Sequence, residues 1–556
     1  MTSRSLLSGL VIFIASLAAQ AQPAPQSPPT IGSPNTVTAD PAVPRPAGTP
    51  CRVRLFTNVQ FADFSPKTFG YAPPAACPGP WQKVVLEADY SVEPGRQFDR
   101  TATLWIGGVN VYFGTTAEPT ATPVTIGRSW HVERDITDYT AVLLAPAAGR
   151  AELGNLVNST FTSSLWGTAE LAFYPIEKHA HGPTVPDAVL PLSAGPTGGT
   201  LPLSNPSQAL TATFQLPTNV ERAVLDVVLQ HQGANDEFWY TCVPSELSGP
   251  LESCAGGAFR EGEVSIDGQP AGVVPIFPWI FTGGIDPYLW RPIPAVQALN
   301  FVPYRVDLTP FAGVLSDGKS HTFAIRVAGN SNYFQTTATL MLFLDHGARR
   351  VTGEVTENTI GSPSPTIVAP RPDQLADPAV ATVTTTSSRS FVLAGWVLTS
   401  HGKVRTEVRQ TIDFSNLQNL VVPSGASTFV QKIVQLTSIA SVTSVSGGGP
   451  PSQSVTNMSW PLNVQIVSPD NFNTGWTTTI HQAYDRNDST SRAGEDGSSS
   501  VVSNSGDWAD DYPTKTIQSG AQRYFSADSD GRCYSRSLAA RGGVLTSIVD
   551  GVGCGH

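Results

Sequence analysis

The chain has 556 residues, of which only 14% are charged, and it is rich in Gly (49) and Pro (47) and poor in Met (3). This composition favours many short strands joined by turns and argues against helical bundles. The formal net charge of −11, without any run rich in Lys or Arg, argues against nucleic acid or a membrane as a partner.

The first residues are typical of an export signal. Arg4 precedes an apolar run over residues 6–19, which is followed by small residues suited to cleavage near Ala21. The run is too short to span a bilayer, so we expect a signal peptide over residues 1–21; an uncleaved anchor is the alternative. The protein is then secreted or periplasmic. Residues 22–50, mostly small residues and Pro, are predicted to form a disordered leader.

The cysteines support the same compartment. An even number of cysteines in an exported protein predicts disulfide bonds. The six fall into three pairs that are close in sequence: Cys51–Cys77, Cys242–Cys254 and Cys533–Cys554. If all six are paired, no thiol remains for catalysis, which argues against an enzyme with Cys–His chemistry.

Short alternating apolar segments recur along the rest of the chain and predict an all-β protein. They group into one β domain of sandwich size over residues 51–180 and a second over residues 181–355. A Pro-rich linker is expected over residues 356–380, and residues 381–556 are expected to form a third, β-rich domain. Each of the first two domains is long enough to bury a core of its own.

A predicted hairpin in the first domain places charged residues together. Gly107-Gly108 suits a two-residue turn, because both positions need positive φ. Residue 106 then faces residue 109, and outward pairing makes Asp99 and Glu118 diagonal neighbours on one face, roughly 7–8 Å apart. Two carboxylates beside Arg100 can divide acid and base roles. A solvent-exposed ion-pair cluster at the end of the sheet is the alternative.

A second cluster follows a predicted strand in the second domain. In "HQGANDEFWYTC" the acids Asp236 and Glu237 precede Phe-Trp-Tyr, a combination typical of sugar sites. An aromatic plug at the end of a sandwich is the alternative. Further on in the same domain, "FREGEV" contains Arg260 and Glu261, and "YLWRPI" contains Trp290 and Arg291. We find no metal-binding, P-loop or nucleophile-elbow motif, so no cofactor and no metal are expected.

Long segments resemble a known family. They include "WQKVVLEADYSVEPGRQFDRTATLWIGGVNVYFGTTAEPT", "WHVERDITDYTAVL", "NDEFWY", "FREGEVSIDGQPAGVVPIFPWIFTGGIDPYLWRPI" and "DGRCYSRSLAARGGVL". The family is that of the acid-active peptide:N-glycanases typified by the almond enzyme, and the chain is identified as a bacterial member. It is also distantly similar to the flavobacterial peptide:N-glycanase. That resemblance implies two tandem eight-stranded jelly rolls.

The resemblance also implies roles for individual residues. In the flavobacterial relative, an aspartate and an arginine at the start of a strand are essential for catalysis and substrate binding. They match Asp99 and Arg100. Two supporting glutamates of that relative transfer badly, because they fall near Asn158 and Gly256–Gly257. We therefore expect Glu118 and Glu237 to assist Asp99. The expected substrate-binding residues are Arg100, Asp236, Trp239, Arg260, Glu261, Trp290 and Arg291.

The implied reaction is hydrolysis of the amide that joins the innermost N-acetylglucosamine of an N-linked glycan to asparagine. It needs a directed water, oxyanion stabilisation and protonation of the leaving nitrogen, which carboxyl groups can supply at acidic pH without a metal. We expect a monomer that acts on N-glycosylated peptides and glycoproteins. A glycoside hydrolase acting on N-glycans, or a non-catalytic glycan-binding protein, are the alternatives.

Overall fold

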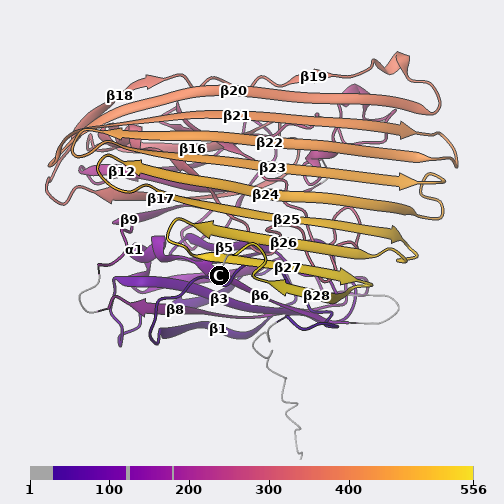
Figure 1. Ribbon diagram of the computed structural model, residues 1–556, viewed down its shortest axis with the longest axis horizontal. Coiled ribbons are helices and arrows are strands. Elements are labelled where there is room, and N and C mark those ends of the chain that lie inside the picture. The colour runs from indigo at the N-terminus through magenta and orange to yellow at the C-terminus, as the bar shows by residue number, and fades with distance from the viewer. Residues whose placement is uncertain (1–28, 120–125, 178–180, 234, 555–556) are drawn as a thin grey trace, which may run out of the picture.

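The computed structural model describes residues 29–119, 126–177, 181–233 and 235–554. The signal peptide expected over residues 1–21 lies outside these ranges. The chain forms two β-sandwiches followed by one broad sheet, which confirms the all-β expectation (Figure 1). The helices in the described ranges are single turns of three or four residues, and none has the length or apolar character needed to cross a membrane.

The first sandwich has eight strands, as expected, in two four-stranded sheets with the orders β1-β8-β3-β6 and β2-β7-β4-β5. Its facing apolar side chains form one core, in which Trp81, Tyr90 and Trp130 are fully buried. A pair of helical turns joins β6 to β7. The elements are β1 (Cys51–Phe61), β2 (Lys67–Tyr71), β3 (Trp81–Val92), β4 (Thr101–Ile106), β5 (Val109–Thr115), β6 (Arg128–Asp135), η1 (Thr137–Tyr139), α1 (Thr140–Leu143), β7 (Ala147–Leu153) and β8 (Leu165–Pro175).

The second sandwich has nine strands, one more than expected. One sheet has the order β10-β17-β12-β15, with β9 also paired to β17, and the other has the order β11-β16-β13-β14. The extra strand, β9, lies at the N-terminal end of this sandwich and pairs with β17. The elements are β9 (Ala188–Leu192), β10 (Leu201–Leu203), β11 (Leu210–Gln215), β12 (Val220–His231), η2 (Trp239–Thr241), η3 (Ser245–Leu247), β13 (Glu261–Ile266), β14 (Gln269–Pro275), β15 (Tyr304–Asp307), η4 (Thr309–Phe311), α2 (Ala312–Leu315), β16 (Ser320–Ala328) and β17 (Phe334–Leu344).

The C-terminal region is a single antiparallel sheet of eleven strands that follow one another in chain order, with β19 also paired to β20 (Figure 1). The stretch expected as a linker, residues 356–380, contributes part of its first edge. The elements are β18 (Thr352–Asn358), β19 (Thr366–Val368), η5 (Pro372–Gln374), β20 (Ala379–Thr399), β21 (Gly402–Val422), β22 (Phe429–Ser446), β23 (Ser452–Ser468), β24 (Trp476–Arg492), β25 (Ser498–Tyr512), β26 (Ser519–Asp528), β27 (Cys533–Arg541) and β28 (Val544–Asp550).

This sheet is amphipathic, and one face covers the sandwiches. Buried and exposed residues alternate along β21, as expected for a strand with one face in a core and one in water. Trp460, Phe414 and Trp508 of the buried face share a continuous core with the second sandwich. The sheet therefore adds a third layer to the second sandwich rather than forming a separate domain.

The described part of the expected leader, residues 29–50, is not disordered. It runs as an extended strap, in which Thr36 N–H donates to Ser129 O (3.1 Å) and Val37 N–H to Pro292 O (3.0 Å). Ala39 is fully buried, and its N–H donates to Gln522 Oε1 (2.8 Å). The expectation failed because these backbone groups find partners in both sandwiches and in the C-terminal sheet, which composition does not reveal.

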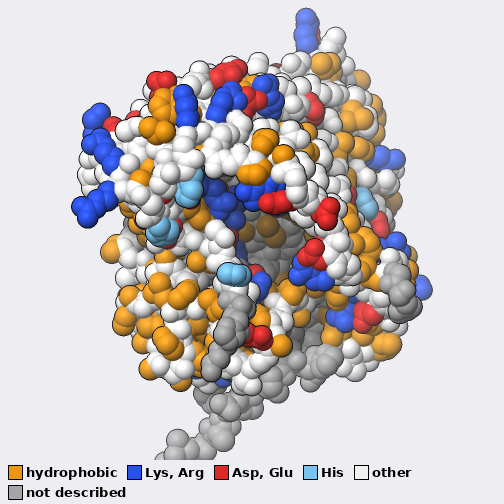
Figure 2. Space-filling model, turned by 60° about the vertical axis from the view of Figure 1, so that its left-hand side comes forward, with side chains coloured by type: hydrophobic (Ala, Val, Ile, Leu, Met, Phe, Trp, Pro, Cys, Tyr) orange, Lys and Arg blue, Asp and Glu red, His pale blue; other side chains and the backbone are white. Residues whose placement is uncertain are grey.

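The three predicted disulfides, Cys51–Cys77, Cys242–Cys254 and Cys533–Cys554, are all present, and no cysteine is free. Each one closes a loop within a single unit of the fold. One face of the molecule is hollowed near its middle, with Lys, Arg, Asp and Glu side chains around the opening (Figure 2). The few charged residues of the chain are thus not spread evenly over this face.

Candidate active site

The β4–β5 hairpin has the predicted turn but not the predicted register. Gly107 and Gly108 have φ of 57° and 82°, and Ile106 faces Val109 as expected. Between Leu104 and the turn a β-bulge adds one residue to β5, so that Leu104 faces Tyr112. The expected diagonal of Asp99 and Glu118 was therefore derived from a wrong register, because a bulge shifts every pair beyond it.

Asp99 and Glu118 nevertheless meet, and they do so at a glycine of the second sandwich. A Cβ placed on Gly283 would lie 3.3 Å from the Asp99 carboxyl carbon and 3.4 Å from the Glu118 carboxyl carbon. Both carboxyl groups thus face the same backbone point. Only a residue without a side chain fits there, so Gly283 is a site residue that the sequence reasoning missed.

Gly283 belongs to the 276–303 loop, which joins β14 to β15. The loop runs along β5, the edge strand of its sheet: Thr115 N–H donates to Ala298 O (2.7 Å) and Phe301 N–H to Phe113 O (2.8 Å). Thr282 Oγ1 also donates to the carbonyl of Thr116. The loop covers an edge that would otherwise be unpaired. It thereby joins the two sandwiches at the site.

Arg100 is held beside the acids by contacts that leave one of its guanidinium nitrogens without a partner among the described residues. Its Nε donates to Phe98 O (2.9 Å), its guanidinium lies over the Phe98 ring (4.0 Å), and Nη1 donates to Asn155 Oδ1. Nη2 is buried without a partner among the described residues. Asn155, not Asn158, is therefore the residue of that segment that contacts the site. The Asn158 side chain instead accepts from Thr160 and Phe161 N–H within its own turn.

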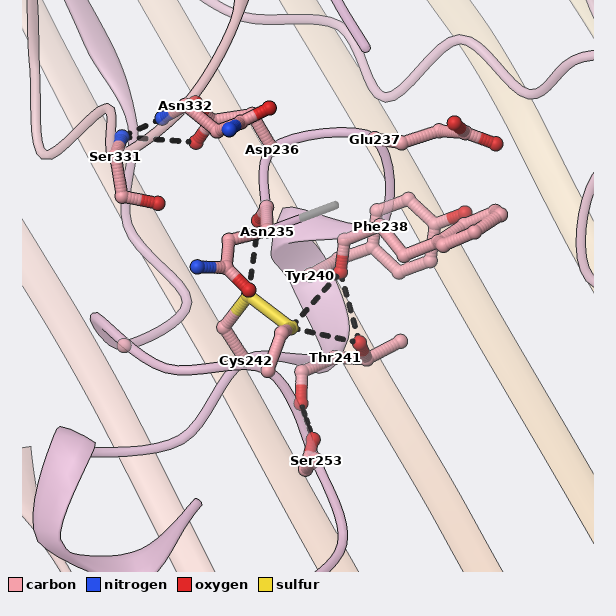
Figure 3. Close-up of a disulfide and its surroundings, with 12 residues drawn as sticks. Asn235, Asp236, Glu237, Phe238, Tyr240, Thr241, Cys242, Ser253, Ser331 and Asn332 are labelled. Carbon is pink, nitrogen blue, oxygen red and sulfur yellow. Dashed lines mark hydrogen bonds between the residues drawn. A yellow bond between two sulfur atoms is a disulfide. The ribbon is translucent and has the colours of Figure 1, made fainter. Parts of the chain in front are cut away.

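Glu237 comes from the loop after β12, which a buried ion pair holds in place. Asp236 Oδ1 accepts from Arg260 Nε (2.9 Å), and both side chains are 0% exposed. Asp236 Oδ2 also accepts from Asn332 and Tyr333 N–H (2.6 and 2.8 Å). Figure 3 shows Asp236 turned toward Ser331 and Asn332, with Glu237 pointing the other way. Asp236 and Arg260 position this loop, whereas the sequence predicted that they bind substrate.

His231 supports the same loop. Burial lowers its pKa to about 4, so the ring is neutral and its Nδ1–H donates to the carbonyl of Glu237 (2.9 Å). The acceptor is a carbonyl, which fixes the tautomer. His231 is a second positioning residue that the sequence reasoning did not select.

Three other predicted substrate-binding residues pack against the C-terminal sheet instead. Trp239 is buried against Phe414 (6.0 Å between rings), and Trp290 against Trp508 (5.0 Å). Glu261 is buried in an ion pair with Arg389. Their side chains offer no free face to a glycan, because the sheet covers them. The prediction failed because a local pattern does not show which residues of the second sandwich a third layer covers.

Arg291 does lie at the site. Its Nη2 donates to Pro119 O (2.7 Å), immediately after Glu118, and its positive charge partly opposes the burial that raises the pKa of Glu118. The side chain is buried, with Nε and Nη1 unpartnered among the described residues. Of the seven predicted substrate-binding residues, Arg100 and Arg291 are those placed beside the acids.

The three acids have raised pKa values with a common cause. Burial raises the pKa of Asp99 to about 6, partly opposed by the Gly283 N–H and by Arg100. Burial and then the charge of Asp99 raise the pKa values of Glu118 and Glu237 to about 7. The negative charge of Asp99 thus opposes the ionisation of both glutamates. A group of carboxyls in which one is ionised and its neighbours are protonated can supply a general base and a general acid together.

Comparison with known proteins gives a consistent result. The family model "Peptide N-acetyl-beta-D-glucosaminyl asparaginase amidase A" matches residues 41–360. A peptide-N4-(N-acetyl-beta-glucosaminyl)asparagine amidase A from Prunus dulcis is 34% identical over 394 residues, which span 66% of this chain and 66% of that protein. All three acids lie inside the matched range, and most of the C-terminal sheet lies beyond it.

Two solved structures are similar to about half of this chain at low sequence identity. PNGase F, a glycosylasparaginase from Flavobacterium meningosepticum, has 12% identity and a TM-score of 0.35, with 53% of this chain and 96% of that chain covered. PNGF-II has 12% identity and a TM-score of 0.36, with 52% and 65% covered.

Proposed function

The chain belongs to the peptide N-acetyl-beta-D-glucosaminyl asparaginase amidase A family, and we propose on this basis that it is a peptide:N-glycanase acting on N-glycosylated peptides and glycoproteins. The observation that carries the proposal is the meeting of Asp99, Glu118 and Glu237, from two sandwiches, in one half-buried group of carboxyls with raised pKa values. The acids and both arginines come from one chain, so the proposed enzyme acts as a monomer.

The reaction is hydrolysis of an amide. Water adds to the side-chain carbonyl carbon of the glycosylated asparagine, and the carbon–nitrogen bond then breaks. The products are an aspartate and a glycosylamine, which loses ammonia in water. The steps that need help are deprotonation of the water and protonation of the leaving nitrogen.

The divided pKa values suit these two steps. Asp99, ionised first, takes the proton of the attacking water, and its buried Oδ1 has no partner among the described residues. Glu118, still protonated, gives its proton to the leaving nitrogen. Arg100 directs its spare Nη2 donor to the oxyanion or the glycan. Glu237, whose pKa the charge of Asp99 also raises, binds sugar hydroxyls.

Export fits this function. The three disulfides support an oxidising compartment, and the apolar N-terminal run supports a signal peptide cleaved near Ala21. We place the enzyme outside the cytoplasm, as a secreted or periplasmic protein.

The test is incubation of the purified protein with a defined N-glycopeptide in heavy-oxygen water. The expected products are a peptide with aspartate in place of asparagine, carrying one heavy oxygen, and a glycan with both core N-acetylglucosamines. A peptide that keeps one N-acetylglucosamine would identify a glycoside hydrolase instead. Binding without turnover would identify a glycan-binding protein.

A comparison of Glu118→Gln with Glu237→Gln tests the assignment of the acid. Activity requires ionised Asp99 and protonated Glu118, so the wild-type profile of kcat/KM rises through about pH 6 and falls above about pH 7. Glu118→Gln should lower kcat by about 10²-fold or more and remove the fall at alkaline pH. Glu237→Gln should mainly raise KM.

The measurement is the pH profile of glycopeptide hydrolysis for both variants and the wild type. If Glu237→Gln removes the alkaline fall and Glu118→Gln keeps it, the two glutamates exchange roles. If both variants keep it, neither glutamate is the acid.

A further inference from the structure

A patch of apolar side chains lies beside the candidate active site, at one end of the first sandwich. It is supplied by the β1–β2 loop, the segment before β4 and the β7–β8 loop. Phe64 is 59% exposed, and Leu156 and Val157 are each 39% exposed. Phe98 and Phe161 are partly buried. We name these five residues the Phe64 patch.

The rings of the Phe64 patch form a continuous row that reaches the active site. The ring centroids of Phe64 and Phe98 are 6.3 Å apart, and those of Phe98 and Phe161 are 4.9 Å apart. The Arg100 guanidinium lies over the Phe98 ring, with Cζ 4.0 Å from the centroid. Asp99 stands between Phe98 and Arg100 in the chain. The patch thus begins at the proposed catalytic base and extends outward to the exposed Phe64.

Backbone hydrogen bonds hold the three loops together. Asn155 N–H of the β7–β8 loop donates to Asp63 O of the β1–β2 loop (3.2 Å). Thr162 N–H, from the same β7–β8 loop, donates to Arg96 O before β4 (3.1 Å). The patch is therefore a preformed surface. Apolar patches that a folded protein keeps exposed to water commonly mark binding surfaces.

The two sides of the active site differ in chemistry. On the side of the second sandwich, a Cβ on Gly284 would lie 3.4 Å from Phe238 Cε1, and Phe238 follows Glu237 in the chain. That side therefore carries a carboxyl group able to bind sugar hydroxyls. On the side of the first sandwich, the side chains of the Phe64 patch have no hydrogen-bonding atoms. A glycan needs polar groups that fix its hydroxyls, so the patch suits the peptide rather than the sugar.

We propose that the Phe64 patch binds the peptide part of the substrate and selects an apolar side chain two residues before the glycosylated asparagine. The proposal rests on the proposed function, which places the asparagine side chain at Asp99. From Phe98 to Phe64 the distance of 6.3 Å is the length of about two extended residues, at about 3.3–3.6 Å each.

The direction of the peptide follows from the substrate itself. The residue two positions after a glycosylated asparagine is Ser or Thr, because N-glycosylation requires the sequence Asn-X-Ser/Thr. The Phe64 patch offers nothing for a hydroxyl group to bond. An apolar surface at that distance therefore fits the residue two positions before the asparagine, which the glycosylation signal leaves free to vary.

The test uses two glycopeptides that carry the same glycan and differ only in Phe or Ser at that position. The wild type should hydrolyse the Phe glycopeptide with a kcat/KM roughly tenfold higher, mainly through a lower KM, because the patch removes the Phe ring from water. Phe64→Ser should hydrolyse both glycopeptides with the kcat/KM that the wild type has for the Ser glycopeptide. Phe64→Leu should keep most of the preference.

Leu144→Ser is the matched control. Leu144 is 49% exposed on the same sandwich, but it lies near the β4–β5 turn, at the opposite end from Asp99: a Cβ on Gly107 would be 2.8 Å from Val142 Cγ2. This variant should keep the wild-type kcat/KM for both glycopeptides. Equal hydrolysis of the two by the wild type, or a preference that persists in Phe64→Ser, would overturn the proposal. An equal fractional loss on both in Phe64→Ser would also overturn it and would indicate that the patch binds the glycan.

A binding measurement separates failure of this proposal from failure of the proposed function. If the wild type releases no glycan, the proposed function fails, and the uncleaved Phe glycopeptide becomes the probe. Saturation-transfer NMR should then show contact of its Phe ring with the wild-type protein and a loss of that contact in Phe64→Ser. Equal transfer from both proteins would overturn the proposal.

Discussion

Replacing Asp99 by asparagine should lower kcat/KM for a glycopeptide by about 10²- to 10⁴-fold, the usual contribution of a general base. The amide keeps the size of the side chain and its place beside Gly283, but it cannot accept the proton of the attacking water. In the variant, burial still raises the pKa values of Glu118 and Glu237, so both remain poor replacements for an ionised Asp99.

The fold should be unharmed, which separates this loss from misfolding. The pKa of Asp99 is raised to about 6 in the folded state, so its ionisation costs stability as pH rises from about 4 to about 6. Above pH 6, Asp99→Asn should melt no lower than the wild type. Asp63→Asn, at an exposed acid of the same sandwich, is the control and should keep full activity. Glycan release by Asp99→Asn within tenfold of the wild type would end the assignment.

Replacing Asp236 by alanine should lower the free energy of unfolding by about 3–5 kcal/mol, the cost of leaving a buried charge without its partner. Arg260 would lose its carboxylate, and the N–H groups of Ser331, Asn332 and Tyr333 would lose their acceptor. Activity should fall as well, because the loop that carries Glu237 loses its anchor. Urea unfolding followed by tryptophan fluorescence measures the change.

Asp138→Ala is the matched control for this prediction. Asp138 pairs with Arg305 at the surface, where both side chains are nearly half exposed. Exposed ion pairs contribute about 1 kcal/mol or less, so this variant should unfold close to the wild type. A loss of less than 1 kcal/mol for Asp236→Ala would show that solvent reaches Arg260 once Asp236 is removed.

The sequence allowed the three acids of the site to be identified, but it did not allow the strand register that places them to be predicted. Gly107-Gly108 defined the hairpin turn, because few other residues take positive φ twice in succession. The bulge that shifts the register has no such marker. Asp99 and Glu118 meet because the 276–303 loop presses Gly283 between them, and a contact over that sequence distance cannot be read from a local pattern.

The predicted substrate-binding residues show where prediction from the local sequence fails. Trp239, Trp290 and Glu261 lie near catalytic residues in the chain, as sugar-binding residues often do. Their side chains are buried under the C-terminal sheet, whose strands are up to 21 residues long and which the sequence predicted only as a separate β-rich domain. Aromatic residues serve equally in a core and in a sugar site, and local sequence does not separate the two uses.

The strap over residues 29–50 has a consequence for the order of assembly. Leu545 forms backbone hydrogen bonds with two residues near the other end of the described chain: Gly32 N–H donates to Leu545 O (2.7 Å), and Leu545 N–H donates to Ser33 O (3.1 Å). Ribosomes release the N-terminus first and β28 last. The contact of Gly32 and Ser33 with β28 therefore cannot form until that strand has been synthesised, so this part of the strap is completed late, after both sandwiches have left the ribosome.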